Sequence, residues 1–402
     1  MGAVASSGED RGESASLMEP LLLGEGTRHR PALADLAFDL ASRSAGFRRS
    51  LPGSILASLA DLVRSMNCYY SNLIEGHDTH PIDIERALND DYSAEPEKRD
   101  LQLEARAHID VQAWIDRGGL AGRATSASGI REIHRRFTTL LPEPMRWVGE
   151  ADDPRRERVV PGELRMRDVA VGRHIAVSPG AVPRFLQRFE VVYRDLGRAD
   201  TVLASAAAHH RLLWIHPFVD GNGRVARLMS HAMMLDALDT RGVWSIARGL
   251  ARSEASYKAH LAAADLTRRN DLDGRGHLSE ATLAGFTRFF LEACIDQVAF
   301  MESLMQPDRL RDRIIAWASE EARAGVLPVH ASRVLEAVLY RGELPRGEVA
   351  ALLATSDRQA RRITAALIDR GALTAAGPRD ALRLAFPAAL AARWMPGLFP
   401  DR

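Results

Sequence analysis

The stretch HPFVDGNGRVAR, residues 216–227, places a histidine, an acid, two glycines around an asparagine, and two arginines within twelve residues. Histidine titrates near neutral pH, so His216 is suited to take a proton from an attacking hydroxyl. Asp220 lies beside the glycines, where a carboxylate can hold Mg²⁺ against phosphate groups. These residue types point to a site for nucleotidyl or phosphoryl transfer.

The same stretch has the features of an anion site. Gly221, Asn222 and Gly223 permit a sharp turn that brings backbone N–H groups close to a ligand. The following helix would begin there, and the unpaired N–H groups of a helix start attract anions. Arg224 and Arg227 are three residues apart, which puts both on one helix face. Guanidinium groups in this arrangement match the oxygens of a polyphosphate.

The elements that must position these residues are predicted to be helices. Pro217 disfavours helical backbone at His216, so one helix ends at the histidine and the next begins at the glycines. Apolar residues recur three and four positions apart through most of the chain. The clearest strand signal is a β-hairpin at about residues 162–177, broken by Gly172. We therefore predict a mainly all-α fold with one β-hairpin.

Composition and periodicity divide the chain into four parts. Residues 1–28 are rich in Gly, Ser and Glu, which predicts a disordered tail. Residues 29–126 form an N-terminal helical region, and residues 127–305 form the central core that carries the motif. Residues 306–402 contain three short helical patterns followed by two strand-like segments around Gly377 and Pro378. This last order is typical of a winged helix-turn-helix domain.

The third helical pattern of the C-terminal part carries Arg358, Arg361 and Arg362, a set that suits DNA phosphates. The alternative is a protein-docking module with a solvated basic face. Both interpretations stay open at this level.

The charge balance, the length of the apolar runs and the cysteine content exclude several classes of protein. Lys+Arg and Asp+Glu are both 53 in a chain of 402 residues, so the net charge indicates neither a nucleic-acid nor a membrane partner. No apolar run approaches the length of a membrane span. The two cysteines, Cys68 and Cys294, fit buried free thiols in a reducing cytoplasm. His209 and His210 lack the acidic or cysteine partners of a metal cluster.

The motif resembles the Fic family signature HPFx[DE]GN[GK]RxxR at every fixed position, and the order of elements from about residue 128 to 300 resembles the Fic core. The resemblance implies transfer of AMP from ATP, with Mg²⁺, to a Ser, Thr or Tyr hydroxyl of a target protein. It implies that His216 is the base and Asp220 the metal ligand, and that Phe218 packs inward. It further implies the phosphate-binding residues: Asn222 with the amides of Gly221 and Gly223 for the α-phosphate, Arg224 for the β-phosphate and Arg227 for the γ-phosphate.

A second motif, SNLIEG at residues 71–76, resembles the inhibitory pattern [ST]xxxE[GN] of many Fic proteins. The resemblance implies that Glu75 pairs with Arg227 and displaces the γ-phosphate, with Ser71 bracing the pair and Gly76 ending the helix. Such proteins can also remove AMP, with the glutamate positioning water. The alternative is an ordinary helix end with a surface glutamate.

The resemblance also implies that the β-hairpin is a flap that adds a strand to an extended target segment. Three rival or additional properties stay open: transfer of phosphate or phosphocholine at the same site, a DNA-binding regulator that works through the winged helix, and a homodimer.

Overall fold

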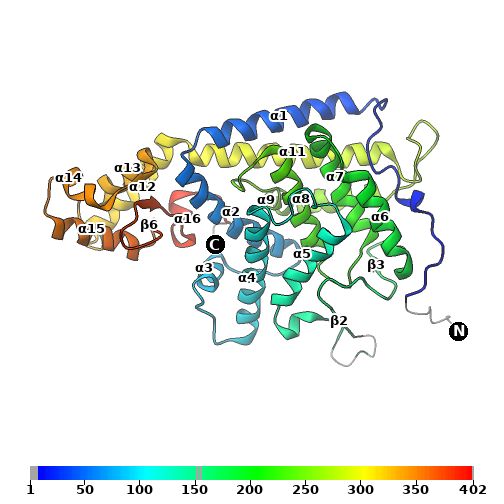
Figure 1. Ribbon diagram of the computed structural model, residues 1–402, viewed down its shortest axis with the longest axis horizontal. Helices are drawn as coiled ribbons and strands as arrows, with labels where there is room; N and C mark the ends of the chain where they lie inside the picture. The colour runs from blue at the N-terminus through cyan, green and yellow to red at the C-terminus, as the bar shows by residue number, and fades with distance from the viewer. Residues whose placement is uncertain (1–7, 151–152, 154–155, 401–402) are drawn as a thin grey trace.

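Helices carry most of the chain, as the periodicity of apolar residues predicts, and the computed structural model describes residues 8–150, 153 and 156–400 (Figure 1). The helices of the N-terminal and central parts are α1 (Arg30–Arg49), α2 (Gly53–Ile74), α3 (Pro81–Leu88), α4 (Pro96–Asp116), α5 (Ala127–Leu140), α6 (Val182–Tyr193), α7 (Arg198–Ile215), α8 (Asn222–Leu238), α9 (Ala247–Arg252), α10 (Glu254–Ala264) and α11 (Glu280–Met305). Short 3₁₀ turns are η1 (Ala15–Met18), η2 (Glu143–Arg146), η3 (Pro179–Ala181) and η4 (Arg346–Glu348).

The central pair of helices, α7 and α8, packs along its whole length and holds the motif in the loop between them. Small residues let the two backbones approach, because Ala206, Ala207 and Ala208 are buried along α7. Helices α2, α4 and α5 pack against α8. The N-terminal helical region therefore borders the start of α8, where the motif lies.

Two small hairpins stand beside the core. Strands β3 (Ala170–Val171) and β4 (His174–Ile175) pair antiparallel and form the predicted hairpin, with the turn at Gly172. Strands β1 (Trp147–Val148) and β2 (Glu157–Arg158) form a second antiparallel pair. This second pair was not predicted from the sequence, because it lies in a proline-rich charged stretch. We call residues 162–177, which include β3 and β4, the flap.

The expectation of a disordered tail at residues 1–28 is wrong for residues 8–28, and residues 1–7 lie outside the described residues. Met18, Leu21 and Leu23 are buried in the core cluster around α6 and α7. The Glu19 carbonyl accepts a hydrogen bond from the Leu278 N–H at 2.8 Å. Three apolar anchors hold this segment, and a composition rich in Gly, Ser and Glu concealed them.

The C-terminal part forms a lobe at one end of the molecule (Figure 1). Its elements are α12 (Pro307–Arg323), α13 (Ala331–Arg341), β5 (Glu343–Leu344), α14 (Val349–Leu353), α15 (Asp357–Asp369), β6 (Leu373–Thr374), β7 (Leu382–Leu384) and α16 (Ala388–Trp394). The strands form one antiparallel sheet in the order β5-β7-β6. Helix α16 returns to α3, and β7 contacts α2, so the lobe packs against the N-terminal helical region.

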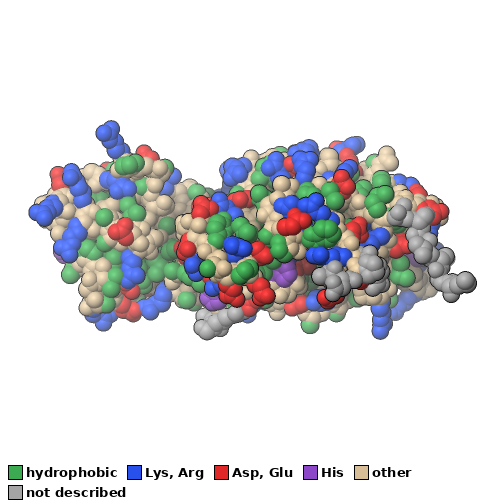
Figure 2. All heavy atoms as spheres, turned by 90° about the horizontal axis from the view of Figure 1, so that it is seen from below, with side chains coloured by type: hydrophobic (Ala, Val, Ile, Leu, Met, Phe, Trp, Pro, Cys, Tyr) green, Lys and Arg blue, Asp and Glu red, His purple; other side chains and the backbone are tan. Residues whose placement is uncertain are grey.

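Arg358, Arg361 and Arg362 are exposed on α15. Figure 2 shows Lys and Arg side chains at the outer end of this lobe with Asp and Glu side chains between them. DNA binding by a winged helix therefore stays a prediction. Within the described part of the chain, no helix has the length and apolar character needed to cross a bilayer. Cys68 and Cys294 are buried free thiols, as predicted.

Candidate active site

The loop between α7 and α8 is shaped by two residues in left-handed backbone conformations. His216 ends α7 with φ 51° and ψ 63°, and Gly221 precedes α8 with φ 80°. Positive φ is uncommon for a residue with a side chain and marks local strain. Pro217 explains it in part, because it prevents α7 from continuing. The loop therefore turns the chain sharply and starts α8 at the predicted glycines.

Phe218 anchors this loop from inside, as the sequence predicted. Its ring is fully buried and stacks on His134 of α5, with centroids 3.9 Å apart and planes 2° from parallel. The Nδ1 atom of His134 accepts a hydrogen bond from the Gly162 N–H of the flap at 2.9 Å. Burial lowers the pKa of His134 to about 4, so its ring is neutral. His134 thus joins the flap to the loop, and nothing in its sequence context indicated this.

The Asn222 side chain bonds within the loop at the start of α8. Its side-chain oxygen accepts from the Phe218 N–H at 3.0 Å, and its side-chain nitrogen donates to the Phe218 carbonyl at 2.9 Å. Both polar atoms of the amide are therefore used within the loop, and the residue is buried. The Asn222 side chain therefore closes the loop, and binding of the α-phosphate by Asn222 with the amides of Gly221 and Gly223 stays a prediction. The unpaired backbone N–H groups at the start of α8 are of the kind that attracts anions.

Arg227 is brought to the inhibitory motif at the end of α2. Its Nη2 donates to Glu75 Oε1 at 2.5 Å and to the Ser71 carbonyl at 3.0 Å, and its Nε donates to Ser71 Oγ at 2.8 Å. Burial would raise the pKa of the Glu75 carboxyl, but the charges of Arg227 and then Arg224 outweigh it and hold that pKa below its ordinary value. Glu75 is therefore a carboxylate in the anion site.

Gly223 makes room for this carboxylate. A Cβ atom at position 223 would lie 2.3 Å from Glu75 Oε1 and 3.2 Å from Arg227 Nη1. In the present arrangement a side chain at position 223 would therefore require the Glu75 carboxylate to move. In this structure Glu75 fills that space. Gly76 follows in the left-handed region, with φ 84°, and ends the helical segment as predicted.

Arg224 is buried, and its Nη2 atom has two partners. It forms an ion pair with Glu104 of α4, and its Nη2 lies 3.0 Å from Nδ1 of His77. His77 in turn lies 2.8 Å from Glu104, and this hydrogen bond raises the pKa of the imidazole. Glu104 and His77 were missed from sequence. Glu104 lies 120 residues before Arg224, and no motif connects them.

His216 presents a neutral imidazole to the site. Its Nδ1 lies 3.3 Å from the Leu213 carbonyl, an acceptor, which assigns the proton to Nδ1 and leaves Nε2 as the basic atom. Burial lowers the pKa of His216 to about 4. The ring is therefore unprotonated at neutral pH and able to accept a proton.

Asp220 is exposed at the mouth of the loop, next to Gly221. Among the described residues, no group of three His, Cys, Asp or Glu side chains is arranged to hold a metal ion. A single carboxylate fits Mg²⁺, which keeps several waters and takes further oxygen ligands from substrate phosphates. His209 and His210 are buried in α7. His209 Nε2 lies 2.7 Å from the Tyr257 hydroxyl, and His210 Nε2 lies 3.0 Å from a carboxylate oxygen of Asp265, an acidic partner that the sequence did not indicate.

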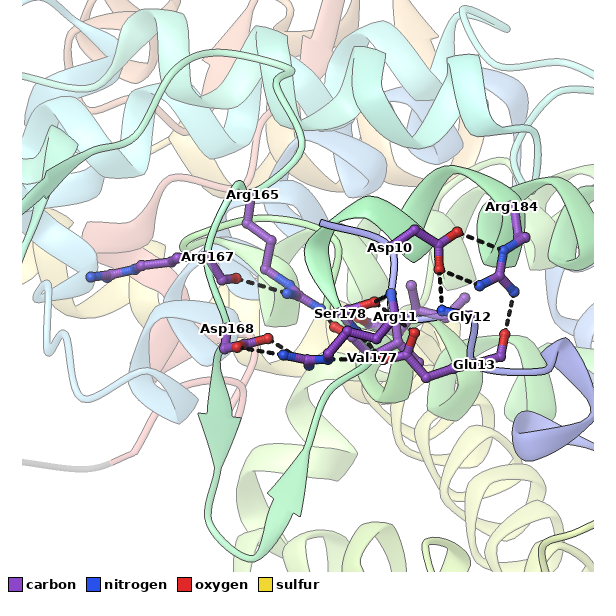
Figure 3. A network of polar contacts seen from close by, with 11 residues as sticks. Asp10, Arg11, Gly12, Glu13, Arg165, Arg167, Asp168, Val177, Ser178 and Arg184 are labelled. Carbon is purple, nitrogen blue, oxygen red and sulfur yellow. Dashed lines mark hydrogen bonds and ion pairs between the residues drawn. The ribbon is translucent and has the colours of Figure 1, made fainter. Parts of the chain in front are cut away.

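Arg165 braces the flap against the loop (Figure 3). It is 1% exposed, and it donates to the carbonyls of His216, Arg167, Val177 and Ile215. Burial lowers its pKa to about 10, so it remains a cation at neutral pH. One side chain therefore joins both stems of the flap to the backbone of the turn at His216. The flap sequence alone did not distinguish Arg165 from its exposed neighbours.

The N-terminal segment adds a second brace, drawn in the same view (Figure 3). Arg11 forms two bonds of 2.8 Å with Asp168 on the first stem of the flap. The Arg11 N–H and the Glu13 carboxylate bond to Ser178, which follows the second stem. The segment that was expected to be disordered therefore holds the two stems together.

Replacing Arg165 with Met should loosen the flap. The change leaves four carbonyls without their donor, and an unsatisfied buried group costs about 1–3 kcal/mol. We expect faster hydrogen exchange of the flap amides and a lower melting temperature. The matched control is Arg173→Met, because Arg173 is exposed in the turn of the same hairpin. Equal exchange in the two variants would contradict a bracing role for Arg165.

Comparisons with known proteins agree with this geometry. Residues 124–234 match the model of the Fic/DOC family. The chain is 33% identical over 142 residues to Protein adenylyltransferase Fic of Drosophila erecta, and 34% identical over 142 residues to the protein of that name from Drosophila melanogaster. Each match covers 34% of this chain and 28% of the relative, so this chain spans less than a third of the length of these curated relatives. A Fic family protein from Desulfovibrio desulfuricans G20 shares the fold, with a TM-score of 0.50 and 16% identity over 88% of this chain and 96% of the other.

Proposed function

We propose, from the match of residues 124–234 to the Fic/DOC family model, that the protein is a protein adenylyltransferase, held inactive by Glu75. It would transfer AMP from ATP to a hydroxyl side chain of a target protein. The observation that carries the proposal is a carboxylate held by Arg227 of α8, the helix that follows the loop with the neutral imidazole of His216. The Glu75 carboxylate on Arg227 occupies the place that a terminal phosphate would take.

The residues supply each part of such a reaction. His216 Nε2 would take the proton of the target hydroxyl as its oxygen bonds to the α-phosphorus. The bond from that phosphorus to the bridging oxygen would break, and pyrophosphate would leave. The N–H groups at the start of α8, with Arg224 and Arg227, would stabilise charge on the phosphates. Mg²⁺ held by Asp220 would neutralise phosphate charge when bound.

Two features of the flap support the proposal that it holds the target segment. Val171 and Ile175 are exposed on its strands, where an extended segment could pair with the hairpin. Arg165 links these strands to the backbone of His216. A target segment on the flap would therefore be held close to the base. Removal of AMP by water positioned at Glu75, a homodimer and DNA contacts from α15 stay predictions.

Intact-mass spectrometry tests the reaction type. Glu75→Gly protein incubated with ATP and Mg²⁺ should gain the mass of AMP on its own hydroxyl side chains. The Glu75→Gly/His216→Ala protein should gain nothing, because it lacks the base. A gain of phosphate alone would replace adenylylation with the rival phosphate transfer.

A further inference from the structure

The two arginines of the anion site have separate carboxylate partners, in different surroundings. Arg227 pairs with Glu75, whose side chain is 29% exposed. Arg224 pairs with Glu104, whose side chain is 2% exposed. An incoming anion can displace a carboxylate that reaches solvent, because water then solvates it. Displacing Glu104 would leave its charge buried and unpaired, which is strongly unfavourable.

Glu104 also fixes the orientation of the Arg224 guanidinium. The Nη2 atom bonds to Glu104 and lies 3.0 Å from His77 Nδ1. The face of the group lies over the Phe137 ring, with its central carbon 5.4 Å from the ring centroid. Among the described residues, Nη1 has no hydrogen-bond partner, and the Nε atom is buried without one. Nη1 is therefore the donor left for a ligand.

The ligand position lies within the same cluster of charges. The pKa of Glu75 responds to Arg224 as well as to Arg227, and the pKa of His77 responds to Asp220. Arg224 Nη2 also lies 3.0 Å from Nδ1 of His77, two residues after Glu75, so its guanidinium lies beside the end of the SNLIEG motif. A guanidinium at this position would contact the β-phosphate, the middle phosphate of a nucleoside triphosphate.

We infer that Glu104 is a positioning residue that holds Arg224 for the β-phosphate of the nucleotide, so that its effect is opposite to that of Glu75. The inference rests on the proposed function, because it takes a nucleoside polyphosphate as the ligand. Removing Glu75 frees an arginine for phosphate. Removing the charge of Glu104 leaves an arginine without its fixed orientation.

The test is nucleotide binding rather than turnover. We would measure the affinity of Glu75→Gly protein for ADP and for AMP by calorimetry with Mg²⁺, and repeat it with Glu75→Gly/Glu104→Gln protein. AMP lacks the β-phosphate and so reports on the rest of the pocket. The matched control is Glu75→Gly/Asp116→Asn, because Asp116 is another buried carboxylate of α4, paired with Arg64 and His231 away from the loop.

Glu104→Gln should weaken ADP binding by about tenfold or more, the effect of one charge-assisted hydrogen bond, and should change AMP binding by less than about twofold. Asp116→Asn should leave the ratio of the two affinities unchanged. Equal losses for ADP and AMP would mean a general structural role and would overturn the inference, as would tighter or unchanged ADP binding. If Glu75→Gly protein binds neither nucleotide, the proposed function fails instead.

Discussion

Glu75→Gly is expected to raise self-modification with AMP by about 100-fold, because a charge-assisted buried pair contributes about 2–4 kcal/mol. Glu75 reaches Arg227 at 2.5 Å and fills the space above Gly223. Its carboxylate competes with the terminal phosphate for one guanidinium. Without it, the triphosphate can lie along the start of α8 with the α-phosphorus in line with the incoming hydroxyl.

The measurement is the initial rate of label incorporation from fluorescent or radioactive ATP. Glu25→Gly is the matched control, because Glu25 is an exposed glutamate that also precedes a glycine. Its rate should equal that of the parent. Equal rates for Glu75→Gly and the parent would show that the carboxylate does not restrain the enzyme.

Ser71→Ala should give a smaller increase than Glu75→Gly. It removes the hydroxyl that accepts from Arg227 Nε at 2.8 Å, whereas the bond to the Ser71 carbonyl remains. The rate should rise from the parent to Ser71→Ala to Glu75→Gly, because Ser71→Ala removes a neutral hydrogen-bond partner of Arg227 whereas Glu75→Gly removes its carboxylate partner.

His216→Ala in the Glu75→Gly protein is expected to lower transfer by about 10²–10⁴-fold, the usual contribution of a general base. Nucleotide binding should change little, since the imidazole faces the attacking hydroxyl rather than the phosphates. Calorimetry with ADP provides this second readout. Loss of binding together with loss of transfer would indicate a damaged loop rather than a missing base.

The same residue sets the pH dependence. A histidine with an ordinary pKa of about 6.5 would lose half of its basic form at that pH. Burial lowers the pKa of His216 to about 4, so the neutral ring persists in more acidic solution. The transfer rate of Glu75→Gly protein should stay level from pH 8 to about pH 5 and fall only below that range. A midpoint near pH 6.5 would contradict the buried geometry.

Stability in acid must be followed in that experiment. Burial lowers the pKa values of His108 and His209 to about 3 and those of His134 and His210 to about 4. The unfolded chain binds protons at these histidines near pH 6.5, and the folded chain does not. The free energy of unfolding should therefore decrease as the pH falls below about 6.5 and continue to decrease toward pH 4, by up to about 1.4 kcal/mol per pH unit for each histidine. Circular dichroism at each pH separates loss of fold from loss of the base.

Much of the site could be predicted because its geometry is local. Pro217 and the glycines at 221 and 223 define a turn and a helix start by their own backbone preferences. The spacing of Arg224 and Arg227 places both in the first turns of α8. The hairpin at 170–175 also follows from neighbouring residues. The pairing of Glu75 with Arg227 spans 152 positions, and it was expected only through the resemblance to a family.

The sequence by itself determined the helical class, the turn that opens α8 and the chemical types of the groups along it. Only the tertiary structure decided that Asn222 closes the loop, that Arg165 joins the flap to His216, and that Glu104 lies under Arg224. It also decided that residues 8–28 are ordered. The physical reason is the same in each case. Backbone preference acts over a few neighbouring residues, whereas a buried charge or an apolar anchor is defined by partners that folding brings from distant parts of the chain.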